Sequence, residues 1–409
     1  MIDFWGVARR IRWDRARPSG VRRVLLGRLG LMWQADAQSQ VVVDLDAIRA
    51  NVRTLRSNTP AEVMAVVKAD GYGHGMVASA RAALSGGATW LGVCTLDEAF
   101  GLREAGLATP VLAWLWLPGQ PVGRAIECDV DLSVASLSQL AAVTAGARAA
   151  GRAARIHLKI DTGLSRSGAA APEWPQLVEA ASKAQADGYA EVIGVWSHFA
   201  CADAPGHETV DRQLAGFADA LDVAKRLGVE PQLRHMANSA ATLTRPDTHF
   251  DLVRPGIAMY GLSPLDDPAV RATLRPAMTA RARVLLAKRV PAGQGVSYGH
   301  TYVTPRASTV ALVPLGYADG VPRHASNLGP VLLNGGRYTV AGRVCMDQFV
   351  VDVGDAEVAE GDEVVLFGPG DQGEPTADDW AEAVGTINYE IVTRFGSARV
   401  PRIYRGDAA

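Results

Sequence analysis

Apolar runs of strand length alternate with amphipathic stretches through the middle of this chain, and no other feature of the sequence limits its fold as much. The stretches 96–105, 137–150 and 210–227 place apolar residues at helical three- and four-residue spacing. Runs of strand character occupy 63–67, 90–93, 111–117, 131–135, 155–160, 192–197, 232–236 and 251–253. Eight β/α units in roughly 200 residues predict a parallel (β/α)8 TIM-type barrel, with a doubly wound open sheet as the alternative.

The pattern changes near residue 279, and a chain of 409 residues is too long for one ordinary core. Strand-like runs at 280–287, 308–315, 338–344, 349–353 and 363–366 are separated by glycine and proline turns, and one helical stretch lies at 377–383. These runs predict a mainly antiparallel β domain. We therefore expect a barrel domain over 39–275 and a β domain over 276–409, with the early strand 41–45 available to pack with the second domain.

Residues 1–38 differ in composition from the rest of the chain. Between Arg9 and Arg28 there are eight arginines and one acid, Asp14. We expect this segment to be a flexible or non-native tail outside the fold. A second interpretation stays open, because the arginine pair at 22–23 and the Ala-Asp-Ala at 35–37 are loosely similar to a twin-arginine export signal, although Arg28 interrupts the apolar stretch.

Composition narrows the classes of partner. The net charge is −2 and no apolar run reaches the ~18 residues of a membrane span, so neither a nucleic-acid nor a membrane partner is indicated. The four cysteines are widely spaced and form no CxxC pair, which argues against a zinc site or a disulfide scaffold. This use of cysteine suits a reducing cytoplasm, and we expect no metal.

Polar side chains fall at the carboxyl ends of five predicted strands, the edge where barrel enzymes carry their chemistry. They are Lys68, Lys159 with Asp161, His198, Asn238 with Ser239, and Arg254. A single lysine or histidine at a strand end is more often solvated or structural than reactive. The convergence of five strands on one rim is what indicates a site.

The loops after the last two predicted strands suit a phosphate group, because Ser239 offers a hydroxyl and Gly256 an unhindered amide. Asn and Ser also cap helices, so this signal is weak by itself. Combined with Lys68 across the barrel mouth, it suggests pyridoxal 5′-phosphate, whose aldehyde forms a Schiff base with a lysine.

Nine collinear segments from about Val41 to Tyr404 are similar to motifs of the alanine racemase family. They are VVKADGYGHG (66–75), HLKIDTGLSRSG (157–168), WSHFACAD (196–203), RHMANSAAT (234–242), LVRPGIAMYGLSP (252–264), VSYGHTY (296–302), VPLGYADGVPR (313–323), GRVCMDQFVVDV (342–353) and GTINYEIVTR (385–394). The chain therefore resembles this family across both predicted domains. Asp70 is a small departure, since many members have Asn there, and residues 1–38 have no counterpart in the family pattern.

The resemblance implies a role for individual residues. Lys68 would form the Schiff base with the cofactor and serve as one catalytic base, and Tyr298 would be the second base. Further cofactor contacts would come from Tyr72, His198, Ser239, Arg254, Gly256, Ile257 and Tyr389. Arg166 and the Met346 amide would bind the substrate carboxylate, and Lys159, His235 and Asp347 would support the site. In the family Lys159 is often carbamylated.

The resemblance also implies an activity, the interconversion of L-alanine and D-alanine, which supplies D-alanine for peptidoglycan in the cytoplasm. Two opposed bases are required because the α-proton must leave one face of the substrate and return to the other. The family forms a head-to-tail homodimer, so Tyr298 and Met346 are expected to reach the site of the other subunit.

Three other functions remain open at this point. A racemase of broader specificity could act on serine, lysine or arginine, since each methylene in a pocket is worth only ~1–3 kcal/mol. A barrel-type pyridoxal-phosphate decarboxylase would share the architecture but needs no second base. A non-catalytic pyridoxal-phosphate binding protein needs no β domain. The VSYG and CMDQ segments favour a racemase over these two.

Overall fold

The computed structural model describes Trp33 and residues 37–271, 273–395 and 399–406. The N-terminal tail and its export-signal alternative fall on residues 1–38, of which 1–32 and 34–36 lie outside the described residues. Among the described residues, no helix is both long and apolar enough to cross a membrane.

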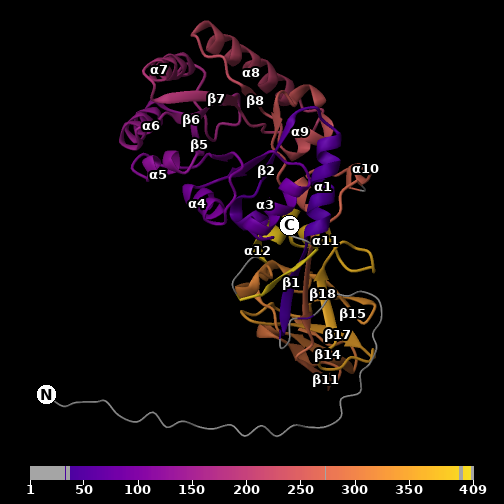
Figure 1. Ribbon diagram of the computed structural model, residues 1–409. Coiled ribbons are helices and arrows are strands. Elements are labelled where there is room, and N and C mark those ends of the chain that lie inside the picture. The colour runs from indigo at the N-terminus through magenta and orange to yellow at the C-terminus, as the bar shows by residue number, and fades with distance from the viewer. Residues whose placement is uncertain (1–32, 34–36, 272, 396–398, 407–409) are drawn as a thin grey trace, which may run out of the picture. The chain divides into compact units, whose positions relative to one another are not determined.

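Eight parallel strands form a nearly closed barrel, as predicted (Figure 1). They are β2 (Glu62–Val66), β3 (Trp90–Val93), β4 (Val111–Ala113), β5 (Val130–Val134), β6 (Ala154–Lys159), β7 (Ala190–Trp196), β8 (Leu233–His235) and β9 (Leu252–Val253). Strands β2 to β8 pair in chain order, and β9 returns to pair with β2. Between β8 and β9 the backbone is joined by single hydrogen bonds, such as Asp251 N–H to Arg234 O at 3.1 Å. The doubly wound sheet is therefore wrong.

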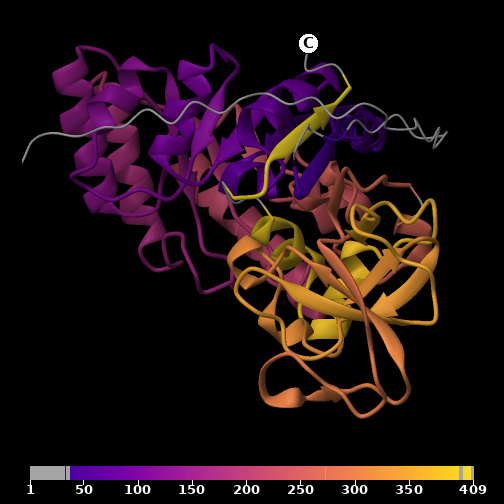
Figure 2. The same ribbon diagram turned by 90° about the horizontal axis from the view of Figure 1, so that it is seen from below.

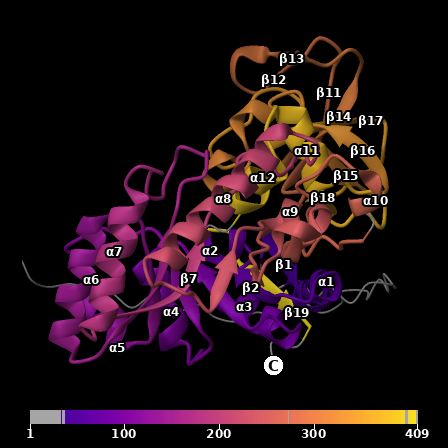
Figure 3. The ribbon, with the colours of Figure 1, turned by 90° about the horizontal axis from the view of Figure 1, so that it is seen from above.

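Helices follow the barrel strands and lie outside them, as Figure 3 shows for α5, α6 and α7. The helices are α1 (Leu45–Ser57), α3 (Met76–Ser85), α4 (Leu96–Glu104), α5 (Val122–Glu127), α6 (Leu137–Ala150), α7 (Trp174–Ala186), α8 (Glu208–Arg226) and α9 (Ser239–Thr244). Local sequence starts several of them: Thr95 and Glu98 form a capping box on α4, and Ser136 caps α6. Each helix buries its apolar face against the strands.

Two separate cores follow from the alternation of side chains along the strands. On β6, Ile156 and Leu158 belong to the large core between strands and helices. A smaller core, which includes Met64, Trp90 and Ile193, fills the inside of the barrel. Successive side chains of a strand point to opposite faces, so Arg155, His157 and Lys159 share the face of β6 that looks into the barrel.

The β domain contains a six-stranded sheet in the order β16-β15-β18-β10-β1-β19. Its strands are β1 (Ser39–Asp44), β10 (Met278–Arg283), β15 (Pro330–Leu333), β16 (Gly336–Thr339), β18 (Glu363–Phe367) and β19 (Arg402–Arg405). The early strand β1 pairs antiparallel with β10 and parallel with β19. Figure 1 shows indigo β1 in the same sheet as the later strand β18, with β10 between them, and Figure 2 shows the yellow β19 beside the indigo segment.

A three-stranded antiparallel sheet completes the domain, with β11 (Leu286–Val290), β14 (Ser308–Val313) and β17 (Phe349–Gly354). A small hairpin joins β12 (Gly295–Val296) to β13 (Tyr302–Val303). The remaining helices are α10 (Pro268–Arg271), α11 (Ala377–Val384) and α12 (Asn388–Arg394). The mainly antiparallel character of the domain agrees with the prediction.

Three predicted strands differ from the structure by more than two residues at one end. The run 111–117 ends as a strand at Ala113, because Leu115 and Leu117 turn outward and are 61% and 71% exposed. The run 280–287 is two strands in two sheets, β10 and β11, which separate at Val284 and Leu285. The run 338–344 ends at Thr339, and Gly342 follows with a positive φ of 83°.

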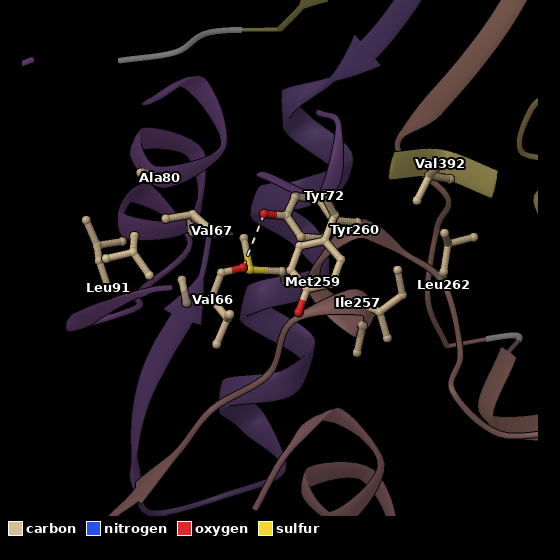
Figure 4. Close-up of a cluster of buried hydrophobic side chains, with 14 of the residues drawn as sticks. Val66, Val67, Tyr72, Ala80, Leu91, Ile257, Met259, Tyr260, Leu262 and Val392 are labelled. Carbon is tan, nitrogen blue, oxygen red and sulfur yellow. Dashed lines mark hydrogen bonds between the residues drawn. The ribbon is translucent and has the colours of Figure 1, made fainter. Parts of the chain in front are cut away.

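Two tyrosines of the barrel domain pack at the end of β2, and helix α12 of the β domain contacts α2 (Lys68–Tyr72), the segment that follows β2. Figure 4 shows the rings of Tyr72 and Tyr260 side by side between Val66 of β2 and Val392 of α12. The ring centroids of the two tyrosines are 5.1 Å apart, and the Tyr260 hydroxyl donates to Val66 O at 3.3 Å. This contact fixes the segment that follows β2, where the site begins.

Candidate active site

A cavity of about 450 Å³ opens at the carboxyl ends of the barrel strands. Ten predicted site residues line it: Lys68, Tyr72, Lys159, Arg166, His198, Ser239, Arg254, Gly256, Ile257 and Tyr389. Four of these are side chains of lysine or arginine, and no carboxylate is among the described residues of the lining. The cavity therefore has the electrostatic character of a binding site for anionic groups.

The segment that carries Lys68 is an unusual turn, α2 (Lys68–Tyr72). Ala69, Asp70, Gly71 and Tyr72 all have left-handed backbone angles, with φ of 53°, 50°, 63° and 53°. Residues other than glycine adopt this conformation at a cost of roughly 1–2 kcal/mol each. Such a turn persists only when its surroundings hold it.

Three hydrogen bonds hold the turn. The Ala69 amide donates to Glu98 Oε1 at 2.7 Å, and the Met76 amide donates to Asp70 Oδ1 at 2.8 Å. Arg402 of β19 donates to the other oxygen of Asp70 at 2.7 Å. Glu98 and Arg402 were not predicted as site residues, and the capping signature Thr-x-x-Glu at 95–98 was the one signal for Glu98.

One side of the cavity offers neutral hydrogen-bond donors. Ser239 Oγ accepts the Gly256 amide at 2.8 Å and the Ala258 amide at 3.3 Å, which leaves its own O–H to donate into the cavity. Burial raises the pKa of the Tyr72 and Tyr389 phenols, so both keep their protons. Position 256 must be glycine, because a Cβ there would lie 2.9 Å from Tyr72 Cζ and closer still to its hydroxyl.

The opposite side is built around the buried guanidinium of Arg254. It donates to Ser197 O at 2.8 Å and Met236 O at 3.2 Å, and it contacts Nδ1 of His235 at 3.1 Å and Nδ1 of His198 at 3.2 Å. Burial lowers the pKa of Arg254 to about 9, so it stays charged at neutral pH. Burial, followed by the Arg254 charge, holds the pKa of both histidines well below the usual range, so both are neutral.

Lys159 lies between these groups with its Nζ 4.1 Å from the Trp196 ring centroid. Its amine donates to Ser167 Oγ at 2.5 Å. Burial, and after it the charges of Arg254 and Arg166, lowers the pKa of Lys159 to about 7. A neutral amine is therefore well populated here at neutral pH.

The loop after β6 carries Arg166 to the cavity. Asp161 Oδ1 accepts the amides of Gly163 and Leu164 at 2.9 and 3.0 Å, and of Ser165 at 3.2 Å. Asp161 does not line the cavity. Its carboxylate shapes the loop instead, as aspartate commonly does after a strand.

Three predicted residues of the β domain lie apart from this cavity. Tyr298 and Met346 are 70% and 53% exposed, and Asp347 pairs with Arg399 at 2.6 Å. Tyr298 is held outward by a turn in which Ser297, Gly299 and His300 all have positive φ. His235 is also absent from the lining and lies behind Arg254.

Comparison with known proteins gives the family. The family model described as alanine racemase, N-terminal domain, matches residues 43–264, and that of the C-terminal domain matches 277–404. An alanine racemase of Salinispora tropica is 67% identical over 376 residues, which cover 92% of this chain and all of that protein. The chain belongs to the alanine racemase family.

Solved structures of alanine racemases have the same fold. That from a D-cycloserine-producing Streptomyces lavendulae is 55% identical with a TM-score of 0.89, and covers 91% of this chain and 98% of its own. That from Streptomyces coelicolor A3(2) is 54% identical with a TM-score of 0.88, and covers 90% and 98%. Apart from Tyr389, every residue that lines the cavity falls in the segment matched by the N-terminal alanine racemase model.

Several lining residues were not predicted. Cys94 and Trp114 follow β3 and β4, and Ser167 and Trp196 lie near Lys159. Cysteine and tryptophan at strand ends resemble ordinary core residues in a sequence, so no signal singled them out. Among the described residues, no group of His, Cys, Asp and Glu side chains is arranged to hold a metal ion.

Proposed function

We propose that this protein is an alanine racemase that uses pyridoxal 5′-phosphate to interconvert L-alanine and D-alanine. The lining of the cavity carries the proposal: four lysine and arginine side chains, two protonated phenols and no carboxylate among its described residues suit a ligand that bears phosphate and carboxylate groups. The membership of the alanine racemase family supports the same chemistry.

The residues present suit the cofactor. Tyr72, Ser239, Gly256, Ile257 and Tyr389 would hold the phosphate, because the free Ser239 O–H and the side-chain-free approach at Gly256 form a cradle that a Cβ would fill. Lys68 would hold the aldehyde, Arg254 would face the pyridine nitrogen, and His198 would pack against the ring. When bound, the cofactor supplies an electron-withdrawing ring that makes the α-proton of an amino acid removable.

The chain's own residues would then position the substrate and move one proton. Arg166, together with the Met346 amide beside Asp347, would bind the carboxylate of alanine. Lys68 would take or return the α-proton on one face, as the base for the D-isomer, and Tyr298 would do so on the other face for the L-isomer. The charge of Arg254 would disfavour a proton on the pyridine nitrogen of the bound cofactor, and this would make transamination less likely than racemisation.

The exposure of Tyr298 supports a further part of the proposal. A catalytic base that is 70% exposed and lies outside its own chain's cavity needs a partner surface. We place it in the cavity of the second subunit of a head-to-tail homodimer, together with Met346. The enzyme would work in the cytoplasm, and its D-alanine would enter peptidoglycan.

The test is to incubate the purified protein and the cofactor with L-alanine, and separately with L-serine, L-lysine and L-arginine, and to measure the D-enantiomers by chiral chromatography. D-alanine should form fastest. The Lys68→Ala and Tyr298→Phe variants should lose racemisation on the order of 10²–10⁴-fold. In Tyr298→Phe the loss of racemisation of L-alanine should be much larger than the loss of exchange of the α-proton of D-alanine with solvent. Tyr338→Phe, on strand β16 of the same domain, is the matched control and should be unaffected.

Each alternative gives a different result. Faster racemisation of a longer amino acid would mean a broader racemase. Release of carbon dioxide without D-enantiomer would mean a decarboxylase, and cofactor binding without any turnover would mean a binding protein.

A further inference from the structure

A line of hydrogen bonds leads from Arg254 into the barrel. Its Nη1 lies 3.1 Å from His235 Nδ1, and His235 Nε2 lies 2.9 Å from His157 Nδ1. His157 Nε2 lies 3.1 Å from Asp131 Oδ2, and Asp131 is paired with Arg155 at 2.8 Å. The line crosses from β9 through β8 and β6 to β5.

The two ends of the line fix the direction of every bond in it. A guanidinium only donates, so His235 must accept at Nδ1 and carry its proton on Nε2. His235 then donates to His157 Nδ1, and His157 carries its proton on Nε2 and donates to Asp131, because a carboxylate only accepts. Both tautomers are thus assigned from the partners at the ends.

The line is closed to water. His157 and His235 are fully buried, Asp131 is 1% exposed and Arg254 is 5% exposed. Aromatic rings flank the imidazoles: Trp196 stacks on His235 with centroids 5.5 Å apart, and Trp90 meets His157 edge-on at 5.6 Å. Buried polar groups of this kind are costly unless each is hydrogen-bonded, and here every member of the line has a partner.

The backbone makes room for the line at one place. Strand β6 pairs with β7 in regular register up to Ile156, and the register then shifts so that His157 lies opposite Gly194. A Cβ on residue 194 would lie 2.9 Å from Cε1 of the His157 ring and closer still to Nδ1. The bulge and the glycine together provide the space that this imidazole occupies. Bulges of this kind are common next to active sites.

We propose that His157 and Asp131 are positioning residues that act through His235 to set the orientation of Arg254. If His157 could not accept a hydrogen bond, His235 would be free to carry its proton on Nδ1, and that proton would face the donor of Arg254. The guanidinium would then have to turn away from the cavity. The expected effect on catalysis rests on the proposed function, whereas the assignment of the two tautomers does not depend on it.

The first test reads the tautomers directly. In protein labelled with ¹⁵N-histidine, NMR should show ring N–H signals from Nε2 of both His157 and His235, with and without the cofactor. In His157→Phe the His235 signal should move to Nδ1 or split between the two nitrogens. A wild-type His235 that carries its proton on Nδ1 would overturn the proposal.

The second test separates positioning from simple support of the fold. His157→Phe should lower kcat on the order of 10–100-fold, as loss of residues that orient primary ligands commonly does, with KM for alanine changed much less. The matched control is His249→Phe, since His249 is also buried and its Nε2 contacts Thr242 O at 3.1 Å, outside this line of hydrogen bonds. Equal losses of kcat in both variants would mean that His157 only supports the fold and does not position Arg254.

Three further variants keep the test decisive if His157→Phe does not fold. Asp131→Asn retains an acceptor for His157 and should keep most of kcat, whereas Asp131→Leu removes it and should behave like His157→Phe. Gly194→Ala pushes the imidazole without changing its chemistry and should lower kcat as well. If the tautomers are as assigned and no amino acid is racemised, the proposed function fails and the hydrogen-bond line stands.

Discussion

Position 256 tolerates no side chain, and this single constraint defines the phosphate end of the cavity. We predict that Gly256→Ala weakens cofactor binding by about tenfold or more, because the new methyl group displaces the Tyr72 ring and removes one donor. The dissociation constant can be followed by cofactor absorbance. Gly206→Ala, where a Cβ would meet nothing within 4 Å, should leave it unchanged.

Lys159 offers a second prediction at the level of one residue. An amine reacts with carbon dioxide only when unprotonated, and a pKa of about 7 makes Lys159 mostly unprotonated at pH 8 and mostly protonated at pH 6. Protein kept in ¹³C-bicarbonate should therefore show a carbamate carbon signal at pH 8 that decreases as the pH falls through 7. Lys183→Ala, which alters an exposed lysine, should keep the signal, and Lys159→Ala should lose it. A signal that persists in Lys159→Ala would contradict this assignment.

Side chains at strand ends were predictable, but those inside the barrel were not. Lys68, Lys159, His198, Ser239 and Arg254 stand where strands end, and the rule for barrels places them together. The alternation in Arg155-Ile156-His157-Leu158-Lys159 did hold a signal, since it sets three polar residues on one face of a strand. Which face looks into the barrel, and that Asp131 meets His157 there, follows only from the pairing of the strands.

At the scale of an element, the left-handed turn α2 carries backbone strain in the site and depends on the hydrogen bonds that hold it. We predict that Asp70→Ala lowers the free energy of unfolding by about 1–2 kcal/mol and also lowers kcat, because it removes both the bond to the Met76 amide and the pair with Arg402. Urea denaturation and steady-state kinetics give the two values.

The Asp70 prediction has two controls. Asp70→Asn keeps an oxygen for the Met76 amide and loses only the charge, so its effect on stability should stay under about 1 kcal/mol. Asp266→Ala removes an ion pair of the exposed Asp266 with Arg271, outside the site, and should change kcat little. If the kcat of Asp70→Ala equalled that of Asp266→Ala, the hydrogen bonds of Asp70 would not be needed to hold the turn for catalysis.

The elements that were predicted with wrong bounds share a physical cause. Residues 111–117 form a continuous apolar run and 280–287 end in one at 284–287, and such runs carry no mark of where pairing stops. Strand β4 ends at Ala113, although Leu115 N–H still bonds to Cys94 O just after the neighbouring strand β3, and Leu115 and Leu117 are exposed. The chain leaves β10 because β11 pairs with β14 in another sheet. In both runs the end of the strand is set by tertiary packing and not by the local sequence.

At the scale of the whole molecule, the proposed exchange of Tyr298 between subunits can be tested by mixing two inactive proteins. When Lys68→Ala and Tyr298→Phe proteins are unfolded together and refolded, half of the dimers should be mixed, and one of the two sites in each should hold both native bases. About a quarter of wild-type activity is expected for a symmetric dimer with shared sites. No recovery of activity would mean that Lys68 and Tyr298 act within one chain.

The position of β1 between β10 and β19 has a consequence for the order of events during synthesis. A ribosome makes β1 before the barrel, yet its partners in the sheet are β10 and, near the other end of the described chain, β19. At roughly 5–20 residues per second, β1 waits on the order of tens of seconds for its last neighbour. The barrel has time to form first, so a chain still on the ribosome carries an unpaired strand edge until β19 has been made.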